Sequence, residues 1–113
     1  MTLGQTQRAF ASCVGQLLHF IDETPGWSVS FDWAYRPPEC AKHLAIDGKG
    51  IINSNHTRRL AIDLNFFRGD EYITDSRLIE PFGIAWEGLH PLARWGGRFS
   101  DGGHFSFQWG GVR

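Results

Sequence analysis

Neither sign of charge dominates this 113-residue chain, which has 11 Lys and Arg residues against 12 Asp and Glu residues. It therefore lacks the basic surface of a nucleic-acid-binding protein or a polybasic membrane anchor. It also lacks the run of about 20 apolar residues that spans a bilayer, and we expect no secretory signal at its N-terminus. Two cysteines are too few for a four-thiolate zinc site. Cys13 and Cys40 are predicted to be small buried hydrophobes.

What the chain does contain is typical of a folded globular protein. Hydrophobic residues make up 42 % and charged residues 20 %, which excludes a disordered chain. The length suits one core, so we expect a single domain over residues 1–113, and a monomer. Five Trp and nine Phe residues occur together with many glycines, which cluster late in the chain: Gly96, Gly97, Gly102, Gly103, Gly110 and Gly111. This combination predicts a compact scaffold whose backbone lies in close contact with other groups at these glycines.

The N-terminal residues 3–22 are predicted to form a helix. Four apolar residues fall at spacings of four, three and four, which place them on one helical face: Phe10, Val14, Leu17 and Ile21. Thr2 is the predicted N-cap, and Pro25 with Gly26 ends the helix.

Three segments are predicted to be strands. Residues 27–35 alternate with period two, which places one apolar face on a core: Trp27, Val29, Phe31, Trp33 and Tyr35. Residues 60–67 form a second strand, with a short hairpin partner at residues 72–73. Residues 104–109 alternate between a polar face and an aromatic face.

Two further helices complete the prediction. The first covers about residues 38–46 and precedes a turn at Gly48 and Gly50. The second covers about residues 76–89, with Thr74 or Asp75 as its cap and Pro81 marking its start or a bend. Helices and antiparallel strands without a βαβ rhythm indicate an α+β fold.

Asp63 is the first sign of chemistry, because a carboxylate inside an apolar strand needs a cation or several donors. His56 precedes that strand, and His104 opens the last one, three residues after Asp101. Two imidazoles and a carboxylate are a zinc ligand set that leaves the fourth position to water, with Asp101 as the base.

Each of these residues also has a purely structural interpretation. His56 is suited to capping a turn, Asp63 to pairing with Arg58 or Arg59, and His104 to a half-buried position in a strand. The spacing of single acids and histidines does not decide between the two interpretations.

Two longer segments resemble a known superfamily. Residues 54–63, SNHTRRLAID, resemble the S-x-H-x-x-G-x-A-x-D signature of the zinc D-alanyl-D-alanine carboxypeptidases and L-alanyl-D-glutamate endopeptidases. Residues 95–105, WGGRFSDGGHF, resemble its second signature, W-G-G followed by D-x-x-H-F. The small phage members are the most similar, since segments like theirs occur in the same order: YRPPE, GKGI, RLAIDLN and WEGLHP.

The resemblance implies a hedgehog-like α+β fold, a small antiparallel sheet with helices packed on one side. It implies Zn²⁺ held by His56, Asp63 and His104, with Asp101 as catalytic base. It also implies that Arg36 contacts the substrate carbonyl and that Ser54 lies on the substrate side.

Two aspects of the substrate groove depend on this chain's own residues. Arg59 departs from the signature, which has Gly there, and is interpreted as narrowing the groove or pairing with a substrate carboxylate. Trp95, Phe99 and Phe105 are suited equally to the groove wall and to the core. Of these three, Trp95 joins Ser54 and Arg59 as a candidate substrate-binding residue.

The implied substrate is the peptidoglycan stem peptide. Similarity to phage lytic proteins favours cleavage of the L-alanyl-D-glutamate bond, and a D-alanyl-D-alanine carboxypeptidase is the alternative. A non-catalytic, zinc-stabilised virion or wall-binding module is an alternative of another class. We expect a protein made in the cytoplasm that reaches the wall through a pore or on a virion, without membrane insertion or nucleic-acid binding.

Overall fold

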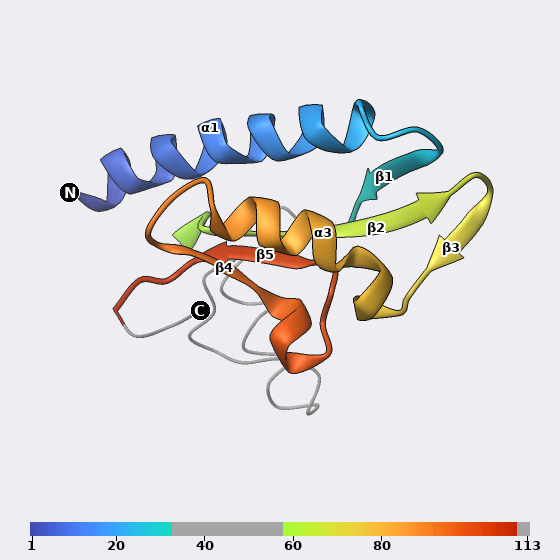
Figure 1. The fold of residues 1–113 in the computed structure, drawn as a ribbon. Coiled ribbons are helices and arrows are strands. Elements are labelled where there is room, and N and C mark those ends of the chain that lie inside the picture. The colour runs from blue at the N-terminus through green and yellow to red at the C-terminus, as the bar shows by residue number, and fades with distance from the viewer. Residues whose placement is uncertain (33–57, 111–113) are drawn as a thin grey trace.

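The computed structural model describes residues 1–32 and 58–110, which form an α+β fold (Figure 1). Its elements, in chain order, are α1 (Leu3–Asp22), β1 (Trp27–Phe31), β2 (Ala61–Arg68), β3 (Glu71–Ile73), α3 (Ser76–Glu87), β4 (Ala93–Trp95), the 3-10 helix η2 (Gly96–Phe99) and β5 (His104–Phe107). The strands form one antiparallel sheet in the order β1-β2-β5-β4, and β3 pairs with β2. In the described part of the chain, no helix is long and apolar enough to cross a membrane.

Helix α1 confirms the sequence prediction at both ends. The Thr2 hydroxyl accepts the Gln5 amide hydrogen, and the Gln5 side chain accepts the Thr2 amide hydrogen, so the helix begins with a capping box. Its apolar face is buried, with Phe10 edge-on to Trp86 at a centroid distance of 5.6 Å. Cys13 belongs to this core, where burial raises the pKa of its thiol.

Both long helices cover the same face of the sheet (Figure 1). Rings from α1 and α3 meet rings from β2 and β5, as in the contacts of Phe10 with Phe107 and of Phe82 with Phe66. Such aromatic pairs contribute about 0.5–1.5 kcal/mol each beyond their area. The opposite face of β2 and β5 carries Asp63 and His104. Packing of the core on one face of the sheet thus fixes the strands that carry the candidate site on the opposite face.

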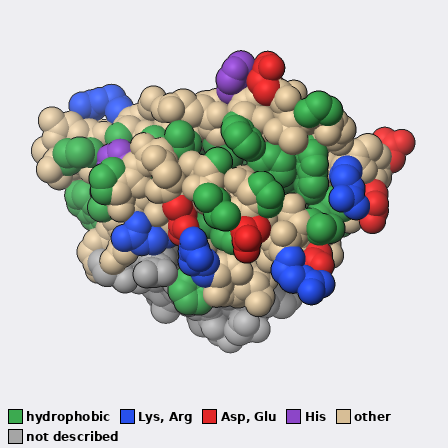
Figure 2. Space-filling view, viewed as in Figure 1, with side chains coloured by type: hydrophobic (Ala, Val, Ile, Leu, Met, Phe, Trp, Pro, Cys, Tyr) green, Lys and Arg blue, Asp and Glu red, His purple; other side chains and the backbone are tan. Residues whose placement is uncertain are grey.

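A band of apolar side chains is exposed between α1 and α3 (Figure 2). Phe20 and Leu89 line a groove of about 560 Å³ there. The groove lies on the helical side of the molecule, so it is separate from the sheet face that carries Asp63 and His104.

The structure corrects the predicted inward face of residues 27–35. Trp27 and Val29 pack against the core, but Phe31 is 62 % exposed. Phe31 is the last residue of β1, and β1 stands at the end of the strand order, so among the described strands it has a neighbour on one edge only. The end of that predicted strand, the predicted helix over residues 38–46, the turn at Gly48 and Gly50, and Cys40 lie outside the described residues.

The other elements match their predictions with small shifts of bounds. The cap of α3 is Asp75, whose side chain accepts the Arg77 amide hydrogen. Pro81 lies inside α3 and does not start it, because the helix already begins at Ser76. The sequence pattern predicted neither β4 nor η2. Each spans only three or four residues, too short for a clear periodicity.

Candidate metal site and its loop

The sheet register brings Asp63 and His104 together. These residues are 41 positions apart in sequence, yet they are directly opposite each other on β2 and β5. The His104 Nδ1 atom lies 2.9 Å from Asp63 Oδ1. Their side chains are 19 % and 22 % exposed, so solvent reaches the pair without surrounding it. An imidazole is therefore one partner of the Asp63 carboxylate.

Neighbouring backbone bonds fix β2 on both edges at this point. The Asp63 carbonyl accepts the Asp32 amide hydrogen, at an N–O distance of 2.9 Å, just beyond β1. On the other edge, the Leu64 amide donates to the Gly103 carbonyl at 2.8 Å. Asp63 thus lies in the middle of a continuous sheet, and its side-chain position is set by strand pairing.

The loop between η2 and β5 carries Asp101. Ser100 ends η2 in the left-handed conformation, with φ of 63°, and turns the chain back toward the sheet. The Asp101 amide donates to the Gly96 carbonyl at 2.9 Å, and the His104 amide donates to the Asp101 carbonyl at 3.2 Å. These two bonds close a compact turn between the predicted base and the predicted ligand.

Close approach, and not backbone freedom, explains the glycines of this loop. Neither Gly102 nor Gly103 has a positive φ. A Cβ at Gly103 would lie 2.5 Å from the Leu64 carbonyl oxygen, and one at Gly102 would lie 2.8 Å from Ser76 Oγ. The two glycines therefore let the loop lie directly against β2 and the start of α3. The predicted close approach is thus confirmed at Gly96, Gly97, Gly102 and Gly103. It is wrong at Gly110, where a Cβ would meet nothing within 4 Å and φ is 56°. Gly111 lies outside the described residues.

Two hollows meet at Asp101. One, of about 200 Å³, is lined by Asp63, Asp101, Asn65 and Tyr72, among others. The other, of about 110 Å³, is lined by Asp101, His104, Trp95 and Phe99. Asp101 is exposed and lines both hollows, one of which is also lined by Asp63 and the other by His104. A small molecule that enters either hollow comes close to a carboxylate.

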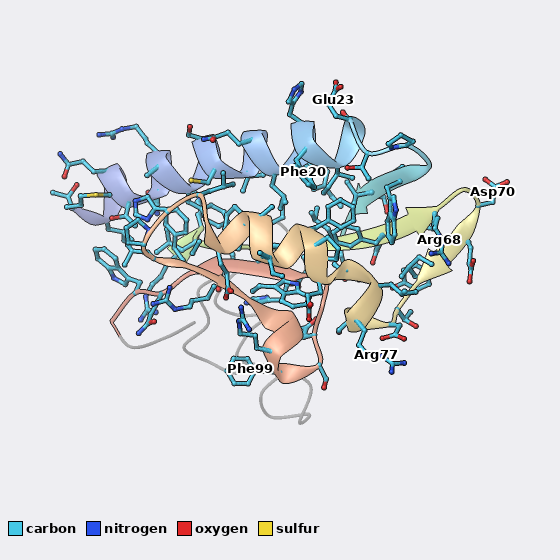
Figure 3. All side chains as sticks on the ribbon, viewed as in Figure 1. Phe20, Glu23, Arg68, Asp70, Arg77 and Phe99 are labelled. Carbon is cyan, nitrogen blue, oxygen red and sulfur yellow. The ribbon has the colours of Figure 1, made fainter. Side chains whose placement is uncertain are left out.

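The three aromatic residues near the site have different environments. Phe105 is fully buried in the core, which decides between its two predicted roles. Phe99 is 66 % exposed on η2 and lines the smaller hollow (Figure 3). Trp95 is only 4 % exposed, and its indole N–H donates to the Gly102 carbonyl at 2.9 Å.

The backbone at Arg59 explains the glycine of the signature. Arg59 precedes β2 with φ of 57°, in the left-handed region that favours glycine. This chain therefore keeps the backbone shape that a glycine would take and places an exposed guanidinium group there. In the sequence, position 59 stood out only because Arg59 replaces the glycine of the signature.

Three predicted site residues, Arg36, Ser54 and His56, lie outside the described residues. Within residues 1–32 and 58–110, no group of three His, Cys, Asp or Glu side chains is placed to hold a metal ion. The Asp63–His104 pair supplies one oxygen and one nitrogen donor, the ligand types that zinc accepts. These two residues fit a zinc site to which a third ligand is added.

A solved structure shares this fold. It is the crystal structure of the Serratia marcescens L-Ala D-Glu endopeptidase ChiX, which superimposes with a TM-score of 0.72 at 14 % sequence identity. The alignment covers 93 % of this chain and 85 % of ChiX. No protein-family model and no curated protein sequence matches the chain. At this identity, the likeness to ChiX shows a common fold.

Proposed function

We propose that this protein hydrolyses the L-alanyl-D-glutamate bond of the peptidoglycan stem peptide, as a zinc peptidase. The observation that carries the proposal is the Asp63–His104 pair, two residues of separate signatures that lie 2.9 Å apart. The fold shared with ChiX, an L-Ala D-Glu endopeptidase, is consistent with it. The proposed zinc ligands are His56, Asp63 and His104.

The chemistry follows from the demands of amide hydrolysis. A bound zinc ion supplies Lewis acidity and lowers the pKa of water toward about 7. Asp101 accepts the proton of the attacking water on its carboxylate and passes it to the leaving nitrogen. Its exposed position between the two hollows suits that transfer. Arg36 opposes the charge that develops on the carbonyl oxygen.

The substrate side consists of Ser54 and Arg59. Arg59 lies two residues before β2 begins and four before Asp63, and its side chain is exposed. A fixed fork of donors at this place suits a carboxylate of the stem peptide, and D-glutamate carries one beside the scissile bond.

The decisive experiment is mass analysis of muropeptides released from purified cell walls by zinc-loaded protein. We expect fragments with a new N-terminal D-glutamate. Asp101→Asn should slow their release by about 100-fold or more while zinc content stays the same. Asp70→Asn, in the exposed hairpin turn, is the matched control and should match the wild type (Figure 3).

Other products would contradict the proposal in different ways. Release of terminal D-alanine would identify a carboxypeptidase. Wall binding without any released fragment would identify a non-catalytic module. Equal rates for the Asp101→Asn and wild-type proteins would exclude Asp101 as the base.

A further inference from the structure

The Trp95 side chain fills a space that only glycines leave open. Trp95 ends β4 opposite Phe105 and is almost fully buried. A Cβ on Gly83 of α3 would lie 2.1 Å from the indole Cδ2, and a Cβ on Gly97 of η2 would lie 2.0 Å from Cζ2. Both distances are far below any van der Waals contact. The two glycines therefore allow α3 and η2 to lie directly against the ring.

The polar end of the same ring holds the loop that carries Asp101. The indole N–H donates to the Gly102 carbonyl at 2.9 Å, in a buried position. Gly102 directly follows Asp101 and precedes His104 by two residues. Since a buried carbonyl without a donor is costly, this bond favours one position of the loop.

A carboxylate fixes the backbone on the other side of Trp95. Glu87 Oε2 accepts the Trp95 amide hydrogen at 3.1 Å, and the Glu87 carboxylate also accepts the Arg98 Nε hydrogen at 3.0 Å. Glu87 of α3 thereby joins β4 to η2. Trp95 thus has its backbone and its ring fixed before the loop begins.

We infer that Trp95 is a positioning residue: through the Gly102 carbonyl, its indole fixes the loop that sets Asp101 against His104. The catalytic part of this inference rests on the proposed function. From the sequence, Trp95 is a candidate substrate-binding residue as well as a candidate core residue. Its small exposed area and its occupied N–H favour an action through the loop, since a ring contact with substrate needs an accessible face.

The test compares three single substitutions in the full chain. Trp95→Phe keeps an aromatic ring and removes the N–H. Gly83→Ala leaves Trp95 unchanged but places a methyl group against its ring. Gly15→Ala is the matched control for Gly83→Ala, because Gly15 is also helical and a Cβ there meets nothing within 4 Å.

Amide hydrogen exchange reads the position of the loop without any substrate. We expect Trp95→Phe and Gly83→Ala to raise exchange at the Asp101 and His104 amides by tenfold or more. The Phe107 amide, which donates to the Leu60 carbonyl in the same sheet, should change by less than threefold. Gly15→Ala should leave all three amides as in the wild type.

Kinetics on an L-alanyl-D-glutamyl peptide then separate positioning from substrate contact. A positioning role lowers kcat of Trp95→Phe tenfold or more and leaves KM within about twofold. Unchanged exchange at Asp101 and His104, or an equal rise at Phe107, would overturn the inference, as would a raised KM at constant kcat. If the wild type cleaves no peptide, the proposed function fails, while the exchange data still decide whether Trp95 positions the loop.

Discussion

Replacement of His104 by alanine tests the metal site most directly. In the zinc-free protein the change removes the 2.9 Å contact with Asp63. A hydrogen bond to a charged group contributes about 1.5–3 kcal/mol. Because both side chains keep some exposure to water, we expect a loss of about 1–2 kcal/mol for this pair.

Zinc should then separate the variant from the wild type. A ligand at 100 times its Kd stabilises the folded state by about 2.7 kcal/mol. Unfolding a chain of 113 residues has an entropy near 0.24 kcal/mol/K, at about 2.1 cal/mol/K per residue. Dividing the stabilisation of about 2.7 kcal/mol by this unfolding entropy gives a rise in Tm of about 11 °C for the wild type. His104→Ala should show a rise of less than about 2 °C, because it lacks one of three ligands.

Differential scanning calorimetry with and without zinc measures both effects, and elemental analysis gives the bound metal. His19→Ala is the matched control, since His19 is exposed on α1 and lies outside the site. A full zinc-dependent rise in His104→Ala would refute the ligand assignment. The absence of any rise in the wild type would refute the zinc site itself.

Three further substitutions test the surroundings of the site. The hydrogen bond from Arg98 lowers the pKa of Glu87, so this pair stabilises the fold above the ordinary Glu pKa and loses that effect as pH falls through the lowered value. Glu87→Gln should therefore reduce the dependence of the unfolding free energy on pH as the pH falls below the ordinary Glu pKa of about 4.3. Arg59→Gly should raise the unfolding free energy by up to about 1 kcal/mol, because it relieves a left-handed backbone. Gly103→Ala should lower it by about 1–3 kcal/mol, because a Cβ would press on a backbone carbonyl of β2.

Urea unfolding at fixed pH measures the two backbone effects, and a pH series measures the first. Glu71→Gln, in an exposed pair of β3, controls for loss of a surface charge. The role of Glu87 would be contradicted if Glu87→Gln kept the pH profile of the wild type. The two backbone predictions would be contradicted if Arg59→Gly were less stable than the wild type, or if Gly103→Ala were as stable as Gly15→Ala.

The local patterns of the sequence were sufficient for most elements. Helix α1 follows from apolar spacing and from Thr2, because both act between residues a few positions apart. The hairpin at Gly69 and helix α3 follow for the same reason. The pattern failed at Phe31, since alternation shows which residues share a face but not whether that face is covered along the whole strand.

For the candidate site, too, the sequence predicted one part and the tertiary structure decided the other. The signatures named Asp63, Asp101 and His104 by residue type and spacing, and the sequence alone could go no further. Only the antiparallel register of β2 and β5 placed Asp63 against His104, because that contact depends on how two distant strands pair. The role of Trp95 likewise became visible only in three dimensions. Its ring meets glycines of two other elements, and no rule about neighbours along the chain encodes such an approach.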